Sequence, residues 1–185
     1  MPNAVHNPTE AALIVLVPEA EPLVGALRLE HGPAAAPGVP AHITINYPVL
    51  PGVDPGEDLY SALSSLFATC APFRFTFKRT ARFPETLYLA PEPAAPLIEL
   101  IELVAAAFPE SPPYGGRFET SIPHLTVAHN KDADALNAIE HKFAELSAEY
   151  LPMPVRVDEV WLLDNRAGRW QKRKAFPLGD AILDP

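Results

Sequence analysis

Short apolar runs typical of strands alternate along the chain with longer stretches that have helical spacing. Period-two or β-rich apolar runs predict strands at residues 12–17, 42–47, 73–77, 86–90, 123–128 and 155–163. Apolar residues at helical intervals predict helices at about 20–30, 56–69, 94–107 and 132–149, the last beginning after Asp132 and Asp134. A final strand near the C-terminus, over Lys172 to Phe176, completes the order β-α-β-α-β-β-α-β-α-β-β.

Length and composition favour a folded chain. The 185 residues are 48% hydrophobic, which is enough for one domain or two tightly joined lobes. The 23 prolines exceed the usual share, but they fall mostly between the predicted elements rather than inside them. We therefore treat residues 1–185 as a single folded unit.

The most informative feature of the sequence is a duplicated tripeptide. His42-Ile43-Thr44 and His124-Leu125-Thr126 are both His-x-Thr, lie 82 residues apart and fall within predicted strands. Each follows a long loop rich in Pro and Gly, residues 31–40 and 109–121. Six His and eight Thr residues would produce well under one such tripeptide by chance. The repeat indicates two equivalent strands.

Strand geometry gives the repeat a chemical meaning. Side chains alternate along a strand, so His42 and Thr44 share one face while the apolar residues between and after them point to the other. His124 and Thr126 share a face in the same way. Two imidazoles and two hydroxyls would then converge on one cleft, each pair held by apolar neighbours on the opposite face.

Such a set of groups suits the cleavage of a phosphodiester. One group must take a proton from the attacking oxygen and another must give one to the leaving oxygen, and imidazoles of ordinary pKa can do both near neutral pH. Hydroxyl donors would hold the charged phosphoryl oxygens in the transition state. Neither a metal nor another cofactor is needed in this scheme.

The two motifs, His42-Ile43-Thr44-Ile45 and His124-Leu125-Thr126-Val127, resemble the paired His-x-Thr/Ser-hydrophobic motifs of the 2H phosphoesterase superfamily. The resemblance is strongest to its 2′-5′ RNA ligase-like branch and covers nearly the whole chain. It implies a bilobal α+β fold, in which two antiparallel sheets related by pseudo-twofold symmetry face each other across a central cleft, with helices outside.

The same resemblance implies an activity and roles for four residues. The family hydrolyses cyclic or 2′-5′ phosphodiesters, commonly opening a 2′,3′-cyclic phosphate to a 2′-phosphate, and some members run the reverse ligation. By this resemblance His42 and His124 are the acid-base pair, and Thr44 and Thr126 hold the phosphate. Family precedent favours His124 as the base, although a pseudosymmetric site can bind its substrate either way round.

The residues that follow the two motifs differ from the basic residues found at these positions in the best-studied members of the family. Alternation places Asn46 on the cleft face, where it either lines the cleft or lies at its outer edge. It places His129 on the face opposite His124, which favours a structural role. In the loop around Tyr114-Gly115-Gly116, Tyr114 is a candidate for contact with a nucleobase, because loops beside a site often carry specificity.

The positive charge is concentrated in two segments although the formal net charge is -9. One holds Arg74, Lys78, Arg79 and Arg82, and the other runs from Arg166 to Lys174. If they border the cleft they would attract an anionic substrate, and otherwise they are solvated hairpins. Arg82, Lys172 and Lys174 are the candidates for substrate binding. The negative net charge argues against a large surface that binds nucleic acids without sequence specificity.

Two other functions compete with a metal-independent phosphodiesterase. A non-catalytic module that binds a nucleotide or an RNA end would keep the same cleft, although both motifs are complete. A metal-dependent hydrolase would use His42, His124 and His129, but no compact set of three or four ligands is evident. The substrate is expected to be a nucleotide or an RNA end.

The cellular location and the oligomeric state of the protein can be judged only from general features of the sequence. The longest uninterrupted apolar run has seven residues, and no secretory signal is evident, so a cytoplasmic protein is expected. A single cysteine, Cys70, agrees with a reducing compartment. The sequence indicates no protein partner, and a monomer is expected.

Overall fold

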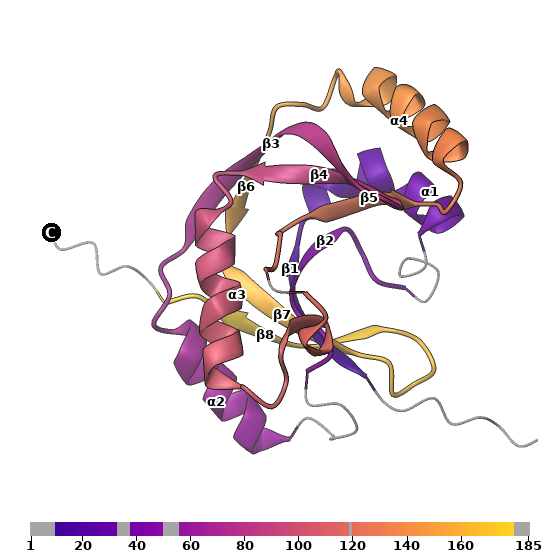
Figure 1. Ribbon diagram of the computed structural model, residues 1–185. Helices are drawn as coiled ribbons and strands as arrows, with labels where there is room; N and C mark the ends of the chain where they lie inside the picture. Colours follow the sequence, from indigo (N-terminus) through magenta and orange to yellow (C-terminus); the bar gives the residue numbers. More distant parts are fainter. Residues whose placement is uncertain (1–9, 33–37, 50–55, 119, 180–185) are drawn as a thin grey trace, which may run out of the picture.

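A computed structural model describes residues 10–32, 38–49, 56–118 and 120–179 (Figure 1). Within them the chain forms four α-helices and eight strands, with short 3-10 turns η1 (Pro18–Ala20) and η2 (Pro113–Gly116). The helices are α1 (Glu21–His31), α2 (Glu57–Phe67), α3 (Ala95–Ala107) and α4 (Ala133–Ser147). The strands are β1 (Ala11–Leu16), β2 (His42–Asn46), β3 (Phe73–Phe83), β4 (Thr86–Glu92), β5 (Leu125–His129), β6 (Met153–Val157), β7 (Glu159–Asp164) and β8 (Gln171–Pro177).

The strands form two four-stranded antiparallel sheets. The first has the order β2-β1-β7-β8 and the second the order β5-β4-β3-β6. The strands that carry the two motifs, β2 and β5, are therefore equivalent edge strands. Each is joined to its neighbour by a helix, α1 between β1 and β2 and α3 between β4 and β5. This α+β fold matches the architecture that the sequence predicted.

The prediction of a single strand over residues 155–163 is wrong. It is two strands, β6 and β7, which belong to different sheets. Val155 and Val157 are buried before Asp158, whereas Val160 and Leu162 are buried after it, so the inward-facing positions change from odd to even. A continuous strand keeps one phase, and this change of phase marks the point where the chain leaves one sheet for the other.

The helices connect the two halves of the molecule. Helix α1 follows a strand of the first sheet and packs on β5 of the second, while α3 follows a strand of the second sheet and packs on β2 of the first. The beginning of α4 matches the prediction, because Asp132 Oδ1 accepts hydrogen bonds from the amides of Asp134 and Ala135. No helix in the described ranges is long and apolar enough to cross a membrane.

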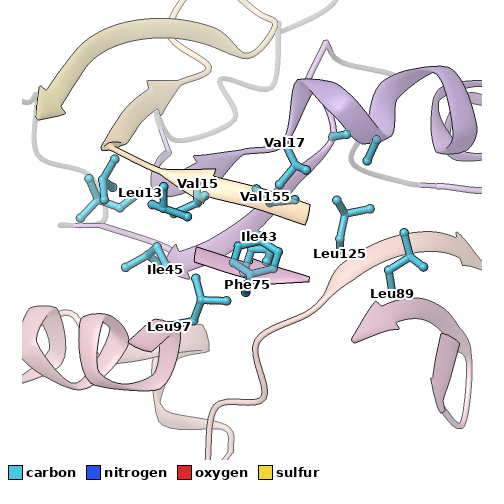
Figure 2. Close-up of a cluster of buried hydrophobic side chains, with 14 of the residues drawn as sticks. Leu13, Val15, Val17, Ile43, Ile45, Phe75, Leu89, Leu97, Leu125 and Val155 are labelled. Carbon is cyan, nitrogen blue, oxygen red and sulfur yellow. The ribbon is translucent and has the colours of Figure 1, made fainter. Parts of the chain in front are cut away.

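A large apolar core contains residues of both sheets and of all four helices, and Figure 2 shows part of it. Ile43 and Ile45 from β2 and Leu125 from β5 point into it, as the alternation predicted, and all three are at most 1% exposed. Phe75 and Leu89 from the second sheet belong to the same cluster. Each motif strand is therefore held by its apolar face, which leaves the polar face toward the cleft.

Candidate active site

The two motif histidines are held by the same local contact. The Nδ1 atom of His42 lies 2.7 Å from the Pro40 carbonyl oxygen, and that of His124 lies 2.8 Å from the Ile122 carbonyl oxygen. A carbonyl oxygen only accepts, so each Nδ1 carries the proton and donates to the residue two positions earlier. Both rings are then left with Nε2 as the group that can take or give a proton.

A single cavity contains the side chains of both motifs. Its volume is about 430 Å³, and His42, Thr44, His124 and Thr126 all line it. Their strands lie side by side at the centre of the molecule, where β2 contacts β5 (Figure 1). The structure thus brings together the four residues that the sequence singled out.

Matching β-bulges follow the two motifs. Leu13 pairs with Asn46 and Ile14 with Thr44, so β2 has one extra residue between them. In β5 the extra residue, Val127, lies between the partners of Leu87 and Tyr88. A bulge changes which later residues face each side of the sheet. In both strands the fifth residue after the histidine, rather than the fourth, lines the cavity.

The bulge in β2 overturns the expectation for Asn46. Its side chain is fully buried and does not line the cavity, because Ile45 and Asn46 both lie on the far side of the strand. Asn46 Nδ2 donates to the Ser111 carbonyl oxygen at 2.9 Å. Asn46 therefore fastens β2 to the loop after α3. Tyr47 takes the position in the cavity that alternation had given to Asn46.

The bulge in β5 likewise overturns the expectation for His129. Its ring lines the cavity that contains His124 instead of facing away from it. Its Nδ1 lies 3.1 Å from Thr86 Oγ1, and its Nε2 lies 3.6 Å from Glu85 Oε2. Both nitrogens of His129 thus have partners, at the start of β4 and in the turn before it, unlike the free Nε2 atoms of the motif histidines.

Tyr114 also lines the cavity, from the η2 turn. Its amide donates to the Tyr47 carbonyl oxygen at 2.6 Å, and it is the one non-glycine residue of the described chain with a positive φ, 53°. Its hydroxyl hydrogen-bonds the Thr44 side chain. Burial raises the pKa of Tyr114, and the bond to Thr44 opposes this rise only in part. The turn therefore places a neutral phenol beside the first motif.

Arg28 of α1 is a cavity residue that the sequence analysis missed. It is 3% exposed, and it is the only Lys or Arg among the described residues that line the cavity. It donates to backbone carbonyls of both motif regions, including that of Thr126 at 3.2 Å. A signal was present, because a charged residue falls on the apolar face of α1, beside Val24 and Leu27.

The cavity changes the pKa values of both motif histidines. The pKa of His42 is lowered to about 4, mainly by burial and also by the charges of Arg28 and His124, while the bond to the Pro40 carbonyl acts in the opposite direction. Burial also lowers the pKa of His124, and the bond to Ile122 opposes that shift. Both rings are therefore neutral when the protein is free at neutral pH.

Comparisons with known proteins agree with this arrangement. The family model described as the 2′-5′ RNA ligase superfamily matches residues 16–169, which is most of the chain. The chain belongs to the 2′-5′ RNA ligase superfamily. Comparison with curated protein sequences gives no match.

Solved structures of low sequence identity share the fold. E. coli LigT complexed with 3′-AMP has a TM-score of 0.60 at 17% identity, covering 93% of this chain and 99% of that one. The protein TT0787 of Thermus thermophilus has a TM-score of 0.59 at 21% identity, with the same coverage. A structure described as a phosphoesterase has a TM-score of 0.60 at 18% identity, covering 94% of this chain and 100% of that one. Membership in the 2′-5′ RNA ligase superfamily implies phosphoesterase activity.

The basic residues predicted to bind substrate do not line the cavity of this superfamily member. Arg82 is held by α4, where its Nη1 lies 2.6 Å from Asn137 Oδ1 and 3.2 Å from Glu140 Oε2. Lys172 Nζ lies 5.0 Å from the centre of the Trp161 ring, and Lys174 Nζ lies 4.9 Å from that of Tyr60. Local carboxylates and aromatic rings therefore hold these cations, which charge clustering in the sequence does not reveal.

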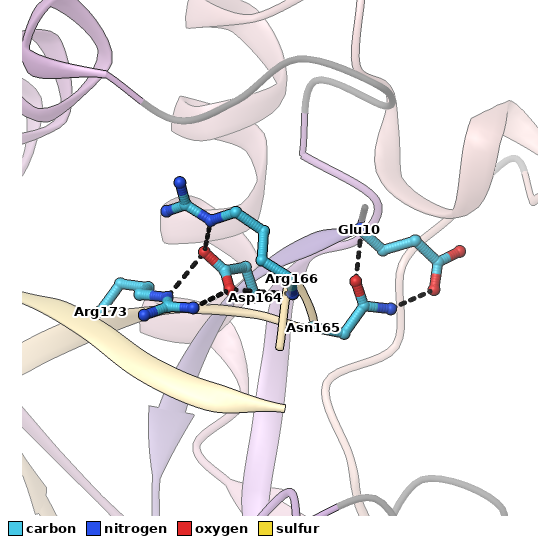
Figure 3. Close-up of polar contacts among 5 residues, drawn as sticks. All are labelled: Glu10, Asp164, Asn165, Arg166 and Arg173. Carbon is cyan, nitrogen blue, oxygen red and sulfur yellow. Dashed lines mark hydrogen bonds and ion pairs between the residues drawn. The ribbon is translucent and has the colours of Figure 1, made fainter. Parts of the chain in front are cut away.

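The same cavity has an apolar end, which we call the apolar shelf. It consists of Ala12, Ile14, Val39, Leu163, Tyr47 and Trp170, which pack together and line the cavity. The Tyr47 and Trp170 rings meet edge to face at 6.1 Å. Glu10 Oε1 accepts from the Tyr47 hydroxyl at 2.9 Å, and Asn165 holds Glu10 in turn (Figure 3). Burial and Glu10 raise the pKa of Tyr47 to about 12.

The described residues of this superfamily member contain no group of three or more His, Cys, Asp or Glu side chains that could hold a metal ion. His129, the third ligand of the metal-dependent alternative, is directed at Thr86 and Glu85. The donor set that zinc catalysis requires is therefore not assembled in this part of the chain.

Proposed function

We propose that this member of the 2′-5′ RNA ligase superfamily is a metal-independent phosphodiesterase that opens nucleoside or RNA 2′,3′-cyclic phosphates to 2′-phosphates. The observation that carries the proposal is the pair of imidazoles in one cavity. Each has Nδ1 held by a carbonyl and Nε2 free, and each has a threonine hydroxyl two residues later. Family membership supports the reaction class.

The chemistry follows from the two equivalent rings. A neutral Nε2 takes a proton from water as the water oxygen bonds to phosphorus. The Nε2 of the other ring takes up a proton from solvent when the anionic phosphate binds beside it, and gives that proton to the ribose oxygen that leaves. The hydroxyls of Thr44 and Thr126 donate to the non-bridging phosphate oxygens, which carry the charge in the transition state. Proton exchange with solvent then restores the two rings.

The shape of the cavity supports a nucleotide substrate. The apolar shelf supplies the aromatic and aliphatic surface on which a nucleobase stacks, and stacking tolerates any base. The buried cation Arg28 lies beside His42, and the carboxylate Glu10 lies at the shelf. An anionic phosphate is therefore drawn to the histidine end and the base to the shelf. The reverse reaction, 2′-5′ ligation, needs no further groups.

The experiment measures hydrolysis of the four nucleoside 2′,3′-cyclic monophosphates and of a short RNA ending in a 2′,3′-cyclic phosphate, with EDTA present. Phosphorus NMR identifies the product. We expect a 2′-phosphate from the wild-type protein and at least a 10³-fold lower kcat in His42→Ala and His124→Ala. His141→Ala, which removes an exposed histidine on α4, is the matched control and retains full activity.

Three outcomes contradict the proposal. Wild-type rates in both motif variants place the chemistry elsewhere. Loss of turnover in EDTA that a divalent metal restores favours the metal-dependent hydrolase. Binding of the cyclic nucleotides without any turnover favours the non-catalytic module that binds a nucleotide or RNA end.

A further inference from the structure

Arg28 lies at the junction of the two motif strands. The guanidinium comes from α1, and no ion pair within the described residues includes it. Its Nη1 donates to the Thr126 carbonyl oxygen of β5 at 3.2 Å, and its Nη2 donates to the Val39 and Pro40 carbonyl oxygens at 3.2 and 3.1 Å. Backbone dipoles rather than a carboxylate contact therefore hold this buried charge.

The same contacts bring the charge next to His42. Arg28 and the His42 ring donate to a single acceptor, the Pro40 carbonyl oxygen, and Arg28 Nη2 lies 3.5 Å from His42 Nδ1. Because Nδ1 already carries a proton, the two groups cannot hydrogen-bond to each other. A second proton on His42 would place two positive charges side by side in a partly buried site.

His124 has the same backbone contact without such a neighbour. Its Nδ1 donates to Ile122, and its pKa is changed by burial and by that bond, with no contribution from a cation. Its ring packs against Phe83 and Tyr88, at 5.1 and 5.4 Å between centres. The two halves of the site are thus alike in geometry and different in charge.

We propose that Arg28 is a positioning residue that gives the pseudosymmetric site its direction, so that His42 is the base that activates water and His124 is the acid. This inference rests on the proposed function. It reverses the direction that resemblance to the family implies. Water loses a proton to His42 Nε2 as its oxygen bonds to phosphorus, the bond from phosphorus to the ribose 3′ oxygen breaks, and His124 Nε2 gives its proton to that oxygen.

The other ionisable groups around His42 do not reverse this asymmetry. Glu21 of α1 accepts from the Ala41 amide at 2.6 Å and stabilises the charge of Arg28. His124, directly before β5, disfavours protonation of His42 when it is itself charged. Tyr114 of η2 is neutral and faces Thr44. The other cavity carboxylate, Glu10, is held by Tyr47 and Asn165, and Glu85 lies beside His129.

A change of leaving group tests the two roles. A ribose oxygen needs a proton from the acid as it leaves, whereas p-nitrophenolate does not. We expect His124→Ala to recover about 10²-fold or more of its loss when thymidine 3′-(p-nitrophenyl phosphate) replaces the cyclic nucleotide, while His42→Ala remains as impaired as before. The opposite pattern, or equal recovery in both variants, overturns the assignment.

The role of Arg28 is tested by removing or keeping its charge. In Arg28→Met we expect NMR titration to show His42 protonating at higher pH than in the wild-type protein, and the acid limb of the kcat/KM profile to move upward with it. Arg28→Lys keeps the charge and is expected to titrate as the wild type does. A purely structural role would affect both variants alike and leave the titration of His42 unchanged.

The two tests separate this inference from the proposed function. An unchanged His42 titration in a folded Arg28→Met, verified by its amide spectrum, overturns the role of Arg28 even if the enzyme is active. If Arg28→Met does not fold, the comparison of Arg28→Lys with wild type and the leaving-group test still decide. Absence of any wild-type turnover refutes the proposed function, and the titration remains interpretable by itself.

Discussion

The two motif histidines of the cavity are each oriented by a contact close in sequence. His42 and His124 both donate to a carbonyl two residues earlier, so the order of residues in the motif also determines the tautomer of each ring. The hydroxyls of Thr44 and Thr126 differ more in their contacts than the two histidines do. Thr44 is bonded to Tyr114, which comes from a distant turn, and this bond orients the hydroxyl before any substrate is present.

Removal of either threonine hydroxyl is predicted to slow the reaction more than it weakens binding. Thr44→Val and Thr126→Val each keep the shape of the side chain, and we expect kcat to fall on the order of 10²-fold to 10³-fold, as it does when an oxyanion donor is lost. Serine at either position should retain most activity. Steady-state kinetics with a cyclic nucleotide measures both, and Thr76→Val, on β3 outside the cavity, is the control. Unchanged kcat in both valine variants would contradict a role in holding phosphate.

At the scale of the elements, the first sheet depends on a buried charge between β7 and β8. Asp164, at the end of β7, is fully buried, and its carboxylate lies 2.7 Å from Arg166 Nε and 2.8 Å from Arg173 Nη2 (Figure 3). Burial raises the pKa of Asp164, but the hydrogen bonds from Arg173 and Arg166 together lower it by a larger amount, so the net shift is downward. This cluster accounts for two of the cations that the sequence suggested for the cleft.

Loss of the Asp164 carboxylate is predicted to destabilise the protein strongly. Asp164→Ala leaves two guanidinium groups without their partner, and we expect the free energy of unfolding to fall by about 3 to 5 kcal/mol. Urea unfolding at neutral pH measures it. The control is Asp158→Ala, because Asp158 pairs with Arg156 on the surface, where such pairs contribute about 0 to 1 kcal/mol. Equal losses in the two variants would contradict the account.

The sign of the pH dependence follows from the lowered pKa. The unfolded chain binds a proton at Asp164 more readily than the folded one, so this contribution is present above the pKa of the unfolded carboxyl and is lost as pH falls through the folded value. The stability difference between wild type and Asp164→Ala should therefore shrink on acidification.

At the scale of the whole molecule, contacts outside the cleft hold the two sheets together. The apolar core contains residues of both sheets, α1 and α3 each pack on the sheet opposite their own strand, and Arg28 bonds to the Thr126 carbonyl oxygen across the junction. The geometry of the candidate active site, with His42 in β2 and His124 directly before β5, therefore depends on both halves being folded together.

The two halves are predicted to unfold in one cooperative transition. Both tryptophans, Trp161 and Trp170, belong to the first sheet and its last hairpin, so their fluorescence reports on that half, whereas far-UV circular dichroism reports on both. We expect the two signals to give the same denaturation midpoint in urea. A fluorescence transition separate from the dichroism transition would show that the halves are independent units.

The sequence by itself determined the features that depend on local periodicity. The order of elements as far as α4, the start of α4 at Asp132 and the sharing of one face by His42 and Thr44 all follow from alternation, helical spacing and capping, which act over a few residues. The repeat of His-x-Thr was enough to identify the family and the four side chains that meet in the cavity.

Only the tertiary structure decided what depends on pairing between distant segments. The bulges that bury Asn46 and turn His129 into the cavity arise from the register of β2 against β1 and of β5 against β4. Arg28 reaches the site because α1 packs on the other sheet, and Arg82 misses it because α4 binds its guanidinium. Register and long-range ion pairing have no local pattern, since each is set by two segments that the chain brings together only on folding.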